Sequence, residues 1–185
     1  MKTTGNTILI TGGGSGIGRA LAESFHAAGN QVIIAGRRQS VLDEVVAANP
    51  GIKALTLDVE SPTAIREFSA KVVAENPDLN VLINNAGIMK QENILEQDEA
   101  LADVEATITT NLLGPIRLTA ALLSHQKAKE NGVIINVTSG LAFVPLVSTP
   151  TYSATKAAVH SYTQSLRFQL RDTPLQVIEL APPGV

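Results

Sequence analysis

The fold is decided by one stretch of sequence, Thr11-Gly12-Gly13-Gly14-Ser15-Gly16-Ile17-Gly18. An apolar run, Thr7–Thr11, leads into it, and a helical pattern over Ile17–Ala28 follows. Glycines at the start of a helix let the backbone approach a phosphate, and the unpaired N–H groups and the helix dipole attract the anion. The last glycine, Gly18, would let the helix pack closely on the strand. This context predicts a nucleotide-binding turn, and a plain tight turn is the alternative.

The rest of the chain repeats the alternation of strand and helix. Five further short runs, nearly continuous in apolar character, are Gln31–Ala35, Lys53–Leu57, Val81–Ile83, Val133–Val137 and Gln176–Leu180. Such runs fit strands that are buried on both faces, as in parallel sheets. Helical patterns lie between them at Val41–Ala48, after Ser61-Pro62, at about 98–127 and at about 151–171. The pattern predicts an α/β domain over residues 1–185, with six strands in a doubly wound, Rossmann-like parallel sheet.

Composition excludes several classes of protein. The 185 residues are 44% apolar and 17% charged, which suits one globular core. The net charge of −3 and the lack of a basic cluster argue against nucleic-acid or membrane partners. There is no cysteine, which excludes disulfides and thiolate ligands, and we expect no metal site. No apolar run approaches the about 18 residues of a membrane span, and no signal peptide precedes the first strand, so we expect a cytoplasmic protein.

Four polar residues are candidates for catalysis. Tyr152 and Lys156 share one face of a predicted helix, and a nearby ammonium favours the ionised form of a phenol, whose pKa is otherwise about 10. Ser139 ends the fifth predicted strand, 13 residues before Tyr152, where the crevice of an open α/β sheet lies. Asn111 lies within a predicted helix although asparagine has poor helix propensity. The alternatives are a turn hydroxyl for Ser139 and a solvated helix residue for Asn111.

The glycine spacing T-G-x-x-x-G-x-G and the order Asn111, Ser139, Tyr152, Lys156 resemble the single-domain branch of the short-chain dehydrogenase/reductase family. The resemblance implies hydride transfer between NADP(H) or NAD(H) and a small alcohol or carbonyl substrate. It gives Ser139 a hydrogen bond to the substrate oxygen and Tyr152 the proton transfer. Lys156 would lower the pKa of the tyrosine and hold the nicotinamide ribose, and Asn111 would support a water relay. A homodimer or homotetramer, formed through the two long helices, is also implied.

The resemblance extends to the cofactor site. The segment Asn84-Asn85-Ala86-Gly87 is similar to the family's segment at the adenosine side, and Asp58-Val59 to the pair that meets the adenine ring. Without the family, these residues would be a strand-end turn and a helix-capping aspartate. The expected cofactor-binding residues are Gly12, Gly14, Ser15, Gly16, Ile17, Gly18, Arg37, Arg38, Asp58, Val59, Asn84, Asn85, Ala86, Gly87, Tyr152, Lys156, Pro182 and Val185.

The end of the second strand indicates which nicotinamide cofactor is used. An NAD-preferring site has an acidic side chain there, which binds the ribose 2′-hydroxyl. Gly36 occupies this position, and Arg37 follows with a planar guanidinium that suits a phosphate. We therefore expect NADP to be preferred, with NAD possible. A solvated basic turn is the alternative interpretation.

The sequence departs from the family in two places. Pro183 stands where the family has glycine, and proline lacks the N–H and has a fixed φ. The chain stops at Val185, before the family's substrate-covering segment and seventh strand, so we expect a truncated chain, with a natural short form as the alternative. Two other functions remain open: a non-catalytic dinucleotide-binding scaffold, and an epimerase or dehydratase of the extended branch, which the glycine spacing disfavours. The substrate is not indicated.

Overall fold

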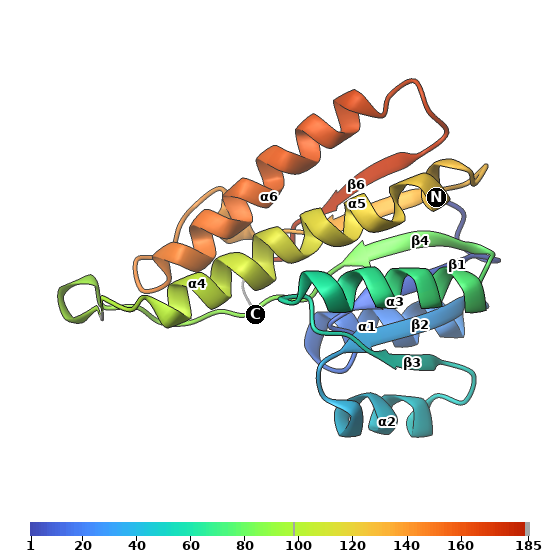
Figure 1. The fold of residues 1–185 in the computed structure, drawn as a ribbon, viewed down its shortest axis with the longest axis horizontal. Coiled ribbons are helices and arrows are strands. Elements are labelled where there is room, and N and C mark those ends of the chain that lie inside the picture. The colour runs from blue at the N-terminus through green and yellow to red at the C-terminus, as the bar shows by residue number, and fades with distance from the viewer. Residues whose placement is uncertain (98, 184–185) are drawn as a thin grey trace.

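The computed structural model describes residues 1–97 and 99–183 (Figure 1). These residues form one parallel sheet of six strands in the order β3-β2-β1-β4-β5-β6. The strands are β1 Thr7–Thr11, β2 Gln31–Gly36, β3 Lys53–Thr56, β4 Leu79–Asn84, β5 Val133–Val137 and β6 Gln176–Leu180. The predicted doubly wound parallel sheet is confirmed. The strand order reverses between β1 and β4, and at such a point the loops after the two strands diverge and leave a crevice.

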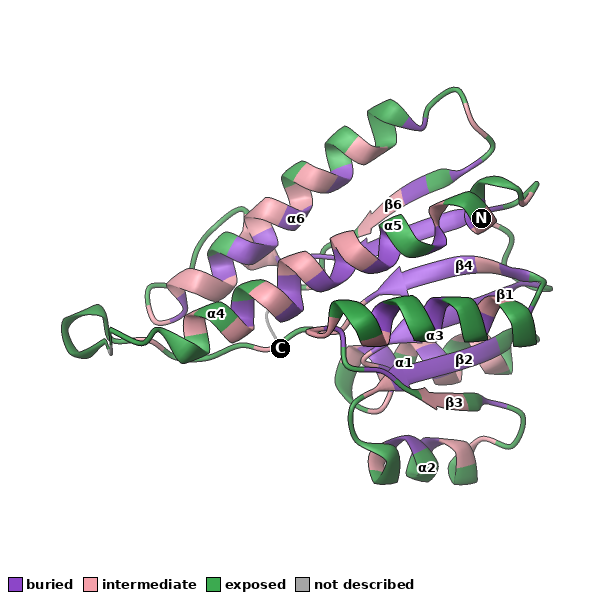
Figure 2. Cartoon of the chain, in the orientation of Figure 1, coloured by how far each residue is buried: buried purple, intermediate pink, exposed green. Residues whose placement is uncertain are grey.

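Helices cover both faces of the sheet (Figure 1). They are α1 Gly16–Ala27, α2 Gln39–Ala48, α3 Pro62–Glu75, α4 Ala102–Ile108, α5 Gly114–Lys127 and α6 Pro150–Gln169. One buried cluster joins Ile8, Ile10 and Ile34 to α1 and α2, and a second joins Leu9 and Leu82 to α3 and α5. Because successive side chains of a strand point to opposite faces, β1, β2 and β4 each supply both clusters. Figure 2 shows the central strands β1, β2 and β4 buried between the two helical layers.

The long helix expected at about 98–127 differs from the prediction. It begins at Ala102, and the π-helical turn Thr109–Leu113 separates α4 from α5. Residue 98 lies outside the described residues. Pro115 lacks the N–H that would bond the carbonyl of Asn111, which accounts for the break in the α-helical pattern. Asn111, expected within a regular helix, thus lies in a π-turn, a feature that is frequent at functional sites.

The glycine turn between β1 and α1 leaves little space for side chains at Gly12 and Gly18. Gly12 has φ of +67°, a backbone conformation that favours glycine, and its N–H donates to the carbonyl of Ala35 at 2.7 Å. A Cβ on Gly18 would lie 2.3 Å from the carbonyl oxygen of Gly12, so α1 packs against the turn only because position 18 has no side chain. Gly18 thus allows close packing, but against the turn after β1 and Asn85 rather than against the strand itself. In the described part of the chain, no helix is both long and apolar enough to cross a membrane.

Candidate active site

A cleft with a volume of about 230 Å³ opens at the carboxyl ends of β1, β2 and β4. It is lined by Thr11, Gly12, Gly14, Ser15, Ala35, Gly36, Arg37, Arg38, Val41, Leu42, Leu57, Val59, Ala86, Gly87, Ile88 and Thr110. Many of these residues were expected to bind the cofactor. The apolar wall that Val41 and Leu42 supply from α2 was missed, although the apolar face of that helical pattern was a usable signal.

The start of α1 suits a pyrophosphate. The side chain of Ser15, the residue before the helix, makes no capping hydrogen bond to the backbone N–H groups of the first turn. Gly14 and Ser15 line the cleft at this point, and a Cβ on Gly14 would lie 2.9 Å from Cγ1 of Val41. A turn without side chains, beside N–H groups at the positive end of a helix, is the arrangement that binds phosphates. The residues present therefore fit a dinucleotide.

The segment after β4 supports the glycine turn. The side-chain amide of Asn85 donates to the carbonyl oxygens of Thr11, at 3.0 Å, and Gly12, at 3.3 Å. The hydroxyl of Thr11 accepts from the backbone N–H groups of Asn85 and Ala86. These bonds tie β1 to β4 across the strand reversal, so Asn85 fixes the wall of the cleft and Ala86 lines it.

Other expected cofactor residues lie around the cleft rather than in its lining. Asn84 is buried and donates to Asn136 Oδ1 at 2.9 Å, and the Asp58 carboxylate accepts from the N–H of Glu60. Gly16, Ile17, Gly18, Tyr152, Lys156 and Pro182 are also outside the lining. The carbonyl of Pro182 accepts from the N–H of Gly140, beside Ser139. Val185 lies outside the described residues.

Three of the catalytic candidates meet where β5 ends. Ser139 follows β5, and its side chain lies close enough to the phenol of Tyr152 to lower the pKa of that phenol. Nζ of Lys156 lies 5.5 Å from the centroid of the Tyr152 ring and donates to the carbonyl of Val137 at 3.0 Å. The helix α6 thus presents Tyr152 and Lys156 together to the end of β5, as the spacing of four residues predicts.

Asn111 connects the catalytic group to the cleft. Its side-chain oxygen accepts from the N–H of Ile88, and its amide donates to the carbonyl of Ile88, both at 2.8 Å. The amide also donates to Thr155 Oγ1 on α6 at 3.2 Å. A Cβ on Gly87, which lines the cleft, would lie 3.4 Å from Asn111 Oδ1 and 3.6 Å from Lys156 Nζ. The missing side chain at Gly87 keeps the cleft, the asparagine and the lysine close together.

Burial sets the protonation of the two titratable groups. It raises the pKa of the Tyr152 phenol above its usual value, and the Ser139 side chain offsets part of this rise. Burial also lowers the pKa of Lys156 to about 8. The lowering of the tyrosine pKa by Lys156 stays a prediction, and in this structure desolvation has the largest effect on the pKa of the phenol. At neutral pH the phenol keeps its proton.

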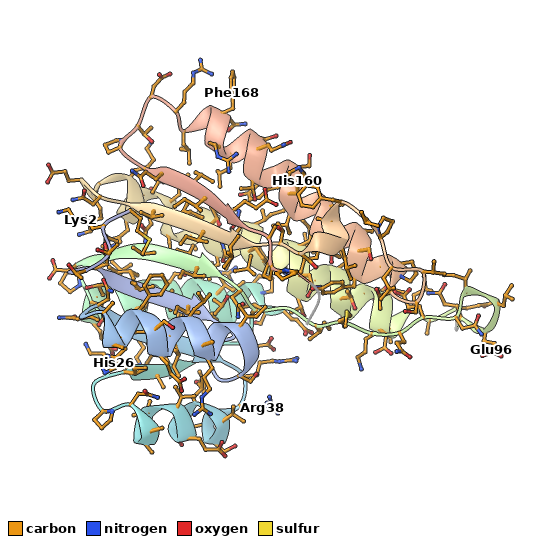
Figure 3. The ribbon with its side chains drawn as sticks, turned by 180° about the vertical axis from the view of Figure 1, so that it is seen from behind. Lys2, His26, Arg38, Glu96, His160 and Phe168 are labelled. Atoms are coloured by element: carbon orange, nitrogen blue, oxygen red, sulfur yellow. The ribbon has the colours of Figure 1, made fainter. Side chains whose placement is uncertain are left out.

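Two glutamates that sequence reasoning missed hold the catalytic elements in place. The Glu92 carboxylate accepts from the N–H of Thr151 at 2.9 Å and from its hydroxyl at 2.8 Å, directly before Tyr152. Glu179 on β6 accepts from the hydroxyl of Thr138 at 2.7 Å and pairs with Nδ1 of His160 at 2.9 Å. Figure 3 labels His160 on α6. Nothing in the sequence marks these distant partners.

The fold and the cleft define a dinucleotide-binding domain of the doubly wound α/β class. The model of the short chain dehydrogenase family matches residues 6–185. The chain belongs to this family.

Relatives and solved structures agree with this assignment. The uncharacterized oxidoreductase DltE of Bacillus subtilis is 44% identical over all of this chain, which spans 73% of DltE. The NADPH-dependent 1-acyldihydroxyacetone phosphate reductase of Schizosaccharomyces pombe is 36% identical over 96% of this chain and 59% of its own length. A short-chain dehydrogenase from Streptomyces avermitilis aligns with a TM-score of 0.89 at 33% identity, over 97% of this chain and 66% of its own. A serine dehydrogenase complexed with NADP+ aligns with a TM-score of 0.89 at 32% identity, over 96% of this chain and 71% of its own.

We expect Lys156→Met to change how the free energy of unfolding depends on pH. The pKa of Lys156 is about 8 in the folded chain, against 10.5 for an unperturbed lysine. Between these values the unfolded chain binds more protons, so the wild type gains stability as pH rises from 8 to 10.5. The gain is at most roughly 3 kcal/mol. Below this interval both states are protonated and the cost of the buried charge is fully present.

Urea unfolding of both proteins across this pH interval measures the effect. As pH rises, the free energy of unfolding of the wild type should increase relative to that of Lys156→Met. Lys71→Met, at a lysine whose side chain is 58% exposed, is the control and should keep the wild-type dependence on pH. Parallel curves for the wild type and Lys156→Met would contradict the buried charge.

Proposed function

We propose that the protein transfers a hydride between NADP(H) and a small alcohol or carbonyl compound, with Tyr152 as the group that moves the proton. The observation that carries this proposal is the convergence of Ser139, Tyr152 and Lys156 at the end of β5, joined through Gly87 to the glycine-lined cleft. An open α/β sheet binds ligands at this edge, where the strand order reverses.

Each catalytic side chain has a role that follows from its contacts. The bound nicotinamide supplies or accepts the hydride. The Ser139 hydroxyl, next to the phenol, orients the substrate oxygen, and Tyr152 donates a proton to that oxygen during reduction. The raised pKa of the phenol suits this direction, because a donor must hold its proton beforehand. Once the proton has left, the ammonium of Lys156 stabilises the phenolate, and Lys156 also holds the ribose.

The preference for NADP(H) rests on the end of β2. Gly36, Arg37 and Arg38 line the cleft there, and Figure 3 labels Arg38 beside α2. Gly36 has no carboxylate to repel a 2′-phosphate, and guanidinium groups bind phosphate well. The NADPH-dependent reductase from fission yeast and the serine dehydrogenase complexed with NADP+ support the same preference.

A symmetric assembly completes the proposal. The helix α6 carries a row of small residues, of which Ala154, Ser161 and Ser165 are exposed and Ala158 is half-buried. Small side chains let two helices approach closely, and a two-fold axis would place the same face of each copy in contact. We therefore expect a homodimer or homotetramer through α4, α5 and α6.

The mass of the protein in solution tests this assembly. Light scattering at micromolar concentration should give at least twice the chain mass of 19.4 kDa. Ser161→Arg should reduce the mass to that of one chain, because the long charged side chain keeps the helices apart. The control is Ser40→Arg, at an exposed residue of α2 outside the expected interface, and it should leave the mass unchanged. A monomer for the unmutated protein would overturn this part of the proposal.

Replacement of the tyrosine tests the chemistry. We expect Tyr152→Phe to lose all but about a hundredth of the turnover on a panel of carbonyl substrates, since general acid catalysis typically contributes 10²–10⁴-fold. The affinity for NADPH should stay nearly unchanged, because only the hydroxyl is removed. Tyr162→Phe, at the other tyrosine of α6, is the control. Activity above that threshold would contradict the role of Tyr152, and NADPH binding without turnover by the unmutated protein would favour the scaffold.

Replacement of the arginine tests the cofactor preference. NADP(H) should bind at least about tenfold more tightly than NAD(H), a difference of about 1.4 kcal/mol. Arg37→Ala should remove most of this difference and leave the affinity for NAD(H) unchanged, because the 2′-phosphate is the only part of the cofactor that would bind the guanidinium. Fluorescence titration of both cofactors measures the four dissociation constants. Equal or tighter binding of NAD(H) by the unmutated protein would refute the preference.

A further inference from the structure

Arg37 already has an anionic partner within the protein. Its NH1 lies 3.1 Å from Oε1 of Glu60, with side chains 54% and 30% exposed respectively. The same carboxylate oxygen accepts from the hydroxyl of Thr110 at 2.8 Å. Arg37 and Thr110 both line the cleft, so Glu60 brings a negative charge to its edge.

Glu60 is held from several sides. Its N–H donates to Asp58 Oδ1 at 3.0 Å, and its carbonyl accepts from Arg117 NH1 on α5 at 3.3 Å. Thr110, its side-chain partner, belongs to the π-turn Thr109–Leu113. Because both its backbone and its carboxylate are anchored, Glu60 is a fixed charge rather than a freely moving surface glutamate.

This fixed charge affects the two cofactors differently. A 2′-phosphate carries nearly two negative charges at neutral pH, whereas a 2′-hydroxyl carries none. The pair with Glu60 neutralises Arg37 and occupies one of its N–H donors, so a phosphate must compete with the carboxylate for the same guanidinium. Among residues 1–97 and 99–183, no carboxylate lies within ion-pair distance of the neighbouring Arg38.

We propose that Glu60 determines cofactor specificity: its carboxylate competes with the 2′-phosphate for Arg37 and so limits the preference for NADP(H) over NAD(H). This inference rests on the proposed function, which places the 2′-phosphate at Arg37. It assigns a role in selectivity to a residue 23 positions beyond Arg37 in the sequence.

The test is Glu60→Gln, which removes the charge and keeps an oxygen that can accept from Thr110. The dissociation constant of NADP+ should fall about threefold or more, and that of NAD+ should stay within about twofold, since exposed ion pairs have modest energies. The gain should shrink at high salt, because the Debye length falls from about 10 Å at 0.1 M to about 3 Å at 1 M. Isothermal titration with both cofactors measures these values.

Two controls make the result specific. Glu75→Gln changes the net charge equally but lies at the far end of α3, about 20 Å along a helix with a rise of 1.5 Å per residue, and should change neither constant. In an Arg37→Ala background, Glu60→Gln should give a gain for NADP+ of less than about twofold, because the competition requires Arg37.

The possible results distinguish a failure of the role of Glu60 from a failure of the proposed function. If the unmutated protein binds neither cofactor, the proposed function fails and this inference fails with it. If it binds both, and Glu60→Gln leaves their ratio unchanged or weakens NADP+, only the role of Glu60 is overturned. A gain that persists without Arg37 would also overturn the competition for that arginine.

Discussion

The close approach of α1 to the end of β1 is the constraint on which the other features of the site depend. A Cβ on Gly18 would overlap the carbonyl of Gly12, and one on Gly12 would lie 2.9 Å from Cα of Ala86. Because Gly12 and Gly18 have no side chains, α1, the glycine turn and the segment after β4 can pack in direct contact. The Asn85 amide then bonds the carbonyls of that turn. The outcome is a cleft whose floor is backbone, as a dinucleotide requires.

A buried ammonium is the second defining feature. Desolvation disfavours the charged form of Lys156, and the carbonyl of Val137 is the acceptor that partly compensates for it. The same burial keeps the Tyr152 phenol protonated. An apolar side chain packed at position 156 would avoid the free-energy cost of burying a charge. The burial of Lys156 beside Tyr152 is therefore better explained by a role in catalysis than by a contribution to stability.

The sequence predicted the sheet well because its central strands β1, β2, β4 and β5 are buried on both faces and read as nearly continuous apolar runs. The glycine turn was predictable for a similar reason: its backbone geometry admits few residues besides glycine. Contacts between distant segments were not predictable. The pairs Glu92–Thr151, Glu179–His160 and Glu60–Arg37 join positions that only the packed sheet brings together. The break at Asn111 was missed because a helical period alone does not reveal a π-turn, although Pro115 was a usable signal.

We propose that the glycine turn and the end of β5 form one site, with the dinucleotide extending from one to the other. A crystal structure of the protein grown with NADP+ tests this most directly. We expect pyrophosphate oxygens within about 3.2 Å of backbone N–H groups at the start of α1, and the nicotinamide ribose beside Tyr152 and Lys156. A cofactor with its phosphates away from α1, or with its nicotinamide remote from Tyr152, would contradict the account.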